Sequence, residues 1–116
     1  MQIHDQMQAA THYALQGLAE RSEVRAHNVA NLNTPGFRAE RVDFESTLRA
    51  ALDRGDATAA AEPARTVDPN LPGPHGNTAS LESEMTGMMK DNLTREAMVN
   101  AYNWKTTLLR NAITSR

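Results

Sequence analysis

Apolar and small residues recur at three- and four-residue steps along the first 31 residues, a spacing that keeps them on one side of a helix. We therefore expect a single helix over residues 3–31. The positions that carry the pattern are Ile3, Met7, Ala10, Ala14, Leu18, Ser22, Ala26 and Val29. Because many of these side chains are small, another helix can approach this face closely.

A stronger pattern runs through residues 79–114 and predicts a second long helix. Ten positions follow alternating steps of four and three, as in a coiled-coil seam with polar interruptions. They are Leu81, Met85, Met88, Asn92, Arg95, Val99, Tyr102, Thr106, Leu109 and Ile113. A second apolar stripe lies beside the seam and consists of Met89, Leu93, Ala97, Ala101, Trp104, Leu108 and Ala112.

A helix with two adjacent apolar stripes can bury both only against more than one partner. The chain has just one other helix of similar length, so we expect other chains to cover the surplus apolar surface. Trp104 is the best single anchor for such an interface. The polar seam positions Asn92 and Arg95 either fix the helix register through specific polar partners or face a groove or water.

The segment between the long helices predicts a short helix and a linker. Residues 44–54 have one apolar side, with Asp43 as a plausible N-cap and Arg54-Gly55 as a fitting end. Residues 55–77 hold four of the five prolines and half of the six glycines, and no periodicity survives there. This composition predicts a linker or an extended excursion, with room for a helical turn at residues 57–62.

These elements predict an all-α fold. Long N- and C-terminal helices form an antiparallel coiled-coil-like pair, a short third helix follows a Pro-Gly turn, and the Pro-rich middle segment is flexible. We divide the chain into residues 1–54, residues 55–77 and residues 78–116.

Residues 28–37 are expected to close the first helix and reverse the chain. Asparagine tolerates the left-handed conformation that ends helices, so Asn31 or Asn33 is expected to serve as the C-terminal cap. Thr34 precedes a proline and is pushed out of the helical region. Pro35 and Gly36 suit the two central positions of a type II turn.

The same ten residues match the pattern NxANxxTPGF. They resemble the N-terminal signature of the rod, hook and axial proteins of the bacterial flagellum, carried here by Asn28, Ala30, Asn31, Asn33, Thr34, Pro35, Gly36 and Phe37. A second block, Val42-Asp43-Phe44-Glu45, and a third, residues 76–85, are similar to the proximal rod members of that family. The third block fits GNxxxLExEM. His27 and Leu32 depart from the family's usual residues, and the middle segment is short.

The resemblance implies a structural subunit of the proximal rod of the basal body, part of a tube that transmits torque and surrounds the export channel. It implies as partners other flagellar rod proteins, the membrane-ring/rod junction protein, the export gate and copies of the chain itself. It also implies export by the flagellar type III apparatus without a cleaved signal peptide. Two alternatives stay open: another flagellar axial subunit, and a generic helical adaptor that pairs with one partner through its C-terminal helix.

Composition and charge remove other classes of function. The 116 residues include one Trp, two Tyr and two Phe, so any core is small. A net charge of −2 gives no electrostatic reason to expect nucleic acid, and no apolar stretch approaches the length of a membrane span. Cysteine is absent, and His4 and His12 share no ligand spacing with a third metal-binding residue. Without a catalytic or nucleotide motif, we expect no enzyme, cofactor, metal or small-molecule substrate.

Overall fold

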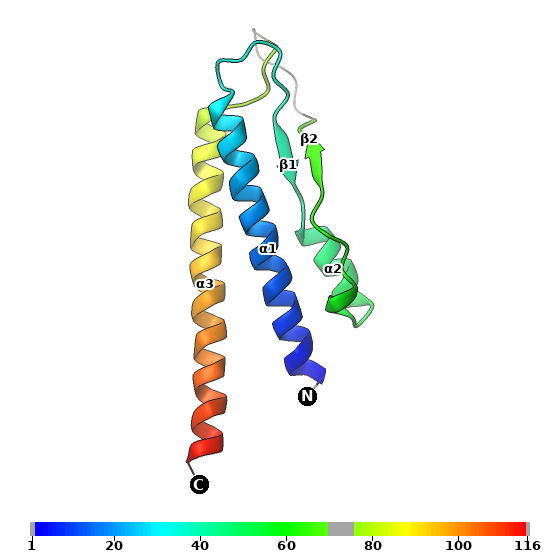
Figure 1. Ribbon diagram of the computed structural model, residues 1–116, viewed down its shortest axis with the longest axis vertical. Coiled ribbons are helices and arrows are strands. Elements are labelled where there is room, and N and C mark those ends of the chain that lie inside the picture. Colours follow the sequence, from blue (N-terminus) through cyan, green and yellow to red (C-terminus); the bar gives the residue numbers. More distant parts are fainter. Residues whose placement is uncertain (1, 70–75, 116) are drawn as a thin grey trace.

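The computed structural model describes residues 2–69 and 76–115 and shows a mostly helical, elongated molecule of 66 × 27 × 14 Å (Figure 1). Two long helices, α1 (Gln2–Ala30) and α3 (Leu81–Thr114), run antiparallel and side by side. A short helix α2 (Glu45–Asp53) lies on the other side of α1. The predicted helical fold and the antiparallel pair are confirmed, and each helix boundary lies within two residues of the predicted one.

Helix α2 begins and ends where the sequence predicted, and the caps explain why. The Asp43 carboxylate accepts hydrogen bonds from the Ser46 N–H at 3.2 Å and the Ser46 hydroxyl at 2.8 Å, so Asp43 caps the helix. At the other end the N–H groups of Gly55 and Asp56 bond back to the carbonyls of Leu52 and Ala51. At α3, Ser80 plays the capping role.

The structure also contains a small sheet, which the sequence did not predict. Strands β1 (Glu40–Val42) and β2 (Arg65–Val67) pair antiparallel, with Arg41 opposite Thr66. Strand β2 lies inside the expected linker, which also contains the short 3₁₀ helix η1 (Ala57–Ala59), within the range expected for a helical turn. The part of that linker with Pro72 and Pro74 lies outside the described residues.

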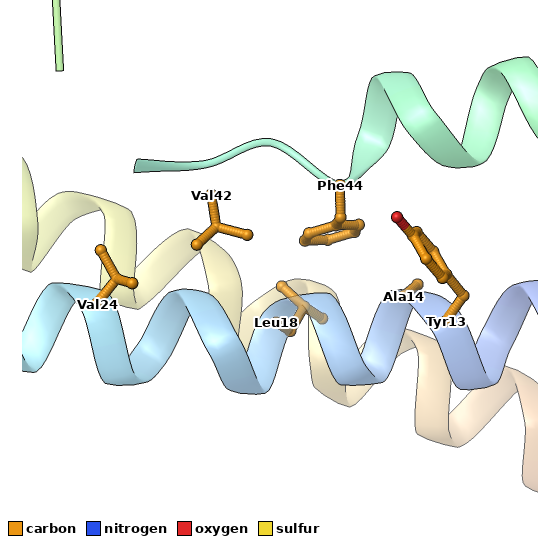
Figure 2. Packing of buried hydrophobic residues seen from close by; sticks show 6 residues of the cluster. All are labelled: Tyr13, Ala14, Leu18, Val24, Val42 and Phe44. Atoms are coloured by element: carbon orange, nitrogen blue, oxygen red, sulfur yellow. The ribbon is translucent and has the colours of Figure 1, made fainter. Parts of the chain in front are cut away.

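The apolar core joins α1 to the excursion formed by β1, α2 and η1 rather than to α3. The buried cluster consists of Tyr13, Ala14, Leu18, Val24, Val42 and Phe44 (Figure 2). Gly17 allows this close approach, because a Cβ at that position would overlap the Phe44 ring. From α3, only the partly buried Met98 packs against this cluster in the part of the chain that the structure describes.

The apolar stripe predicted for α1 is therefore only partly confirmed. Ala14 and Leu18 are buried, whereas Ser22 and Ala26 are exposed and Asn28 is buried instead. The stripe assumed one partner helix, but α1 is contacted on two sides, so its buried surface is wider and includes polar positions.

Candidate assembly site: signature turn and charged clamp

The turn that follows α1, residues 34–37, is called the signature turn below. It has the geometry that the sequence predicted. Gly36 has φ = +74°, and the Phe37 N–H donates to the Thr34 carbonyl at 3.2 Å, as a type II turn requires. Phe37 then packs edge-on against His27, with ring centroids 5.5 Å apart. Pro35 is exposed at the tip of the turn.

The predicted left-handed asparagine cap is wrong. Among the described residues no residue other than glycine has a positive φ, so neither Asn31 nor Asn33 ends α1 in that way. Asn31 acts through its side chain instead, since its amide donates to the His27 carbonyl at 2.9 Å and its Oδ1 accepts from the Thr34 hydroxyl at 3.1 Å. Asn33 and Ala30 are exposed.

Asn77 connects the signature turn to the start of α3. Its Nδ2 lies within hydrogen-bonding distance of three carbonyl oxygens, those of Asn31 (2.8 Å), Leu32 (3.0 Å) and Thr34 (3.0 Å). Its Oδ1 accepts from the Ala79 N–H at 2.7 Å. Two of the blocks that carry the flagellar resemblance, far apart in sequence, therefore meet here, and a single amide group joins them.

Replacing Asn77 with Ala should lower the free energy of unfolding by about 0.5–1.5 kcal/mol, because the turn loses the hydrogen bonds of this amide while the Asn31 and Thr34 carbonyls keep backbone donors. Urea unfolding followed by circular dichroism measures this loss. Asn103→Ala removes an exposed amide from α3 and serves as the matched control. Equal unfolding midpoints for the two variants would show that Asn77 does not hold the turn.

Below this turn, α1 and α3 are joined by a charged clamp, defined as Arg21, Arg25 and Asn28 on α1 with Glu84 and Asp91 on α3. Asp91 accepts from Arg25 Nε at 2.9 Å and from Arg21 Nη1 at 3.2 Å. Glu84 accepts from Asn28 Nδ2 at 3.0 Å and pairs with Arg25 Nη1 at 3.3 Å. Glu84 and Asp91 are each 7% exposed, so these carboxylates are buried in the interface.

The α1 side of the clamp also holds strand β1. Asn28 donates to the Glu40 carbonyl at 3.0 Å and accepts from the Glu40 N–H at 3.1 Å, as a neighbouring strand would. Arg21 donates to the Val42 carbonyl at 2.7 and 3.1 Å, and its Cζ lies 4.6 Å from the centre of the Phe44 ring. Asn28, Val42 and Phe44, all singled out from the sequence, thus act in one connected structure.

Arg21 is held in its charged form. Burial would lower the pKa of Arg21, but its hydrogen bond to Glu45 and the charges of Glu45 and Asp91 outweigh burial and raise the pKa above its ordinary value. The guanidinium is therefore a permanent cation in contact with residues of α2, α3 and β1, and it lies 2.6 Å from Glu45 Oε2.

The cap of α2 should make this helix sensitive to acid. The two hydrogen bonds from Ser46 lower the pKa of Asp43 below its ordinary value, so the folded state binds its proton less tightly than the unfolded state. This contribution to stability is complete above about pH 4, the ordinary Asp range, and is lost as the pH falls through the lower folded pKa. The Ser46 amide NMR shift should follow this titration. Asp43→Asn, which keeps a capping oxygen, should abolish it, and an unchanged titration in that variant would contradict this origin.

The residues expected to form the assembly interface lie mostly on the outside of α3. Ile113 is 74% exposed and Trp104 69% exposed, and Leu81, Met85, Val99, Tyr102 and Leu109 are also exposed. Asn92 and Arg95 are exposed too, whereas Met88 is half-buried. The face of α3 that contacts α1 is instead marked by Glu84, Gly87 and Asp91. The α1–α3 contact in this chain therefore does not use the predicted seam.

Sequence reasoning missed the clamp because it treated charged residues as surface. Glu84 does lie in the first turn of α3, as expected for an acidic residue near a helix N-terminus, but it is also buried and paired. The available signal was the spacing: Arg21 and Arg25 are four residues apart, and Glu84 and Asp91 are seven apart, so each pair shares a helix face.

The described chain offers little other chemistry. It contains no group of three or more His, Asp or Glu side chains placed to hold a metal ion. No helix in residues 2–69 and 76–115 is long and apolar enough to cross a membrane.

Comparison with known proteins identifies the class of this protein, a rod protein of the flagellar basal body. No protein-family model matches the chain. It is similar to the flagellar basal body rod protein FlgB of Yersinia enterocolitica, with 31% identity over 100 residues, covering 69% of this chain and 73% of the relative. FlgB of Salmonella typhimurium is 31% identical over 114 residues, 77% of this chain and 81% of the relative. FlgB of Escherichia coli K12 is 28% identical over 134 aligned positions, 96% of this chain and 97% of the relative.

The chain belongs to the FlgB family of flagellar basal body rod proteins. As a member of that family it is a structural protein and not an enzyme. The Escherichia coli alignment is longer than this chain, so the relative has residues without a counterpart here.

Proposed function

We propose that this chain is a building block of the proximal rod whose α3 surface is completed by neighbouring subunits, forming a tube that transmits torque and surrounds the export channel. The observation that supports this most strongly is that α3 buries charged residues and exposes large apolar ones. Its buried face carries Glu84 and Asp91, while Leu93 and Trp104 are 68% and 69% exposed. Apolar patches of this kind on a small protein mark interaction surfaces.

The interface residues are the exposed members of the seam and stripe. The partners are copies of the chain and other rod proteins, with the membrane-ring/rod junction protein and the export gate at the base of the rod. Export by the flagellar type III apparatus suits a chain whose apolar core is small and whose α3 surface gains burial only on assembly.

Purified basal bodies provide the test of this function. Mass spectrometry of basal bodies from a strain that expresses the chain should identify it in fixed proportion to other rod proteins. A discrete soluble complex with one partner and no signal in basal bodies would favour a helical adaptor instead.

The signature turn should matter for assembly more than for synthesis. Gly36→Val forces a β-branched residue into φ = +74°, which costs of order 1–2 kcal/mol or more and misplaces the segment that leads to α2. We expect a strain carrying only this variant to export the protein but swim poorly. Gly36→Asn, which tolerates positive φ, is the control and should swim, because nothing lies within 4 Å of a Cβ at this position. Normal swimming of the Val variant would refute the role of the turn.

A further inference from the structure

The face of α3 that contacts α1 is less apolar than the faces it leaves outside, although Met98 on this side packs against the core. The three buried positions of this face are Glu84, Gly87 and Asp91, which follow steps of three and four residues. None of these three residues has an apolar side chain. More strongly apolar faces of the same helix, with Met89, Leu93 and Trp104, point away from the chain. If burial of apolar area alone decided the rotation of α3 about its axis, one of those faces would lie against α1.

The charged clamp explains why this face of α3, and not a more apolar one, contacts α1. Arg25 lies across α3 between Glu84 and Asp91, with its guanidinium directly against Gly87, where a Cβ would force the guanidinium to shift. Adjacent residues on a helix are about 100° apart, so a turn of α3 by one position would move both carboxylates off α1. The Arg25 side chain, 21% exposed, would then lack both of its ionic partners.

A contact farther along the two helices fits the same rotation of α3. Lys105 lies two heptads beyond Asp91, on the same side of α3, and its Nζ is 2.8 Å from the Met7 sulfur. This contact is far from the clamp along α1, so it reports the rotation of the whole helix and not the local ion pairs.

We propose that the charged clamp sets the rotation of α3, and so decides which apolar faces remain outside for neighbouring subunits. Arg25, Glu84 and Asp91 are thus positioning residues for assembly. A polar group that fixes register and orientation at the expense of apolar burial is a known device in coiled coils. The consequence for assembly rests on the proposed function, whereas the rotation itself is a property of the single chain.

Cross-linking of two introduced cysteines with a short bifunctional thiol reagent measures the rotation directly, because the chain has no cysteine of its own. Met7→Cys combined with Lys105→Cys reports the observed rotation. Met7→Cys combined with Trp104→Cys reports a rotation by one position. In the otherwise native chain the first pair should cross-link at least about tenfold faster, a preference that corresponds to one charged hydrogen bond.

The decisive variant makes the clamp apolar with Arg25→Met, Glu84→Leu and Asp91→Leu. Replacing a buried ionic group by apolar residues commonly keeps or raises stability, so the helices should stay paired. We expect the two cross-linking rates to come within about twofold of each other, since the charge-assisted preference is gone. The control Arg95→Met, Glu82→Leu, Glu96→Leu likewise removes one Arg and two carboxylates, but at exposed positions of α3, and should retain the native preference.

Three outcomes would overturn the proposal. The native chain could cross-link equally through both pairs, the apolar variant could keep the native preference, or it could lose both cross-links, which would make the clamp a simple attachment. Because this cross-linking is intramolecular, absence of the chain from basal bodies would defeat the proposed function and leave this result standing.

Discussion

Asp91→Ala should lower the free energy of unfolding by about 3 kcal/mol, the cost of leaving buried charge without its partner. Within residues 2–69 and 76–115, Asp91 is the one carboxylate that accepts hydrogen bonds from both Arg21 and Arg25. Arg21 keeps Glu45 and the Val42 carbonyl, and Arg25 keeps Glu84, so the loss stays at the lower end for a buried ion pair. For a small domain this is a large share of its stability.

Urea unfolding followed by far-ultraviolet circular dichroism measures the effect of this substitution. Glu82→Ala removes an exposed carboxylate from the same helix and should stay within about 0.5 kcal/mol of the native chain. An Asp91→Ala midpoint that matches the Glu82→Ala midpoint would mean that the α1–α3 contact is held by other interactions.

Placing Leu93→Glu and Trp104→Glu together on α3 should abolish swimming while leaving the free chain folded. Both side chains are mostly exposed in the single chain, so carboxylates there cost little before assembly. In the rod the same carboxylates would be buried against a neighbour without a partner, which is strongly unfavourable.

Swimming assays and basal-body preparations from a strain carrying only the double variant test this expectation. Leu52→Glu is the matched control, because Leu52 is a 46% exposed apolar residue on α2, outside the α3 surface. Swimming by the double variant at the native rate would show that this face of α3 is not covered in the rod.

Local signals made the helices and the turn predictable. Asp43, Gly55 and the Pro35-Gly36 pair each act over a few residues, through a cap, a helix end and a turn whose geometry depends on neighbours in sequence. The structure agrees with the sequence at these positions because no distant contact competes with them.

The sheet and the clamp depend on residues far apart in sequence. Strand β2 has three exposed residues and no apolar alternation, and it forms because residues 65–67 lie beside β1, whose other edge is held by Asn28 and Arg21. The wrong prediction of an asparagine cap has a similar origin, because Asn77, 46 residues away from Asn31 in sequence, donates a hydrogen bond to the Asn31 carbonyl at the end of α1.

The interpretation of α3 was half right for a physical reason. Its apolar periodicity identified a helix with more apolar surface than one partner can cover, and that surface is exposed in the single chain. Periodicity could not show that the partner helix in the same chain would bind a third, charged face, because Glu84 and Asp91 become interior residues only through Arg21, Arg25 and Asn28.

Assembly of the rod should cover the outer face of α3, which is open in the free chain. Maleimide labelling of a Leu93→Cys variant tests this in a chain that has no other cysteine, with Ala50→Cys on α2 to report that the reagent reaches the sample. We expect residue 93 to react readily in the free chain and to be protected in intact basal bodies. Equal labelling in both states, with residue 50 accessible throughout, would contradict the account.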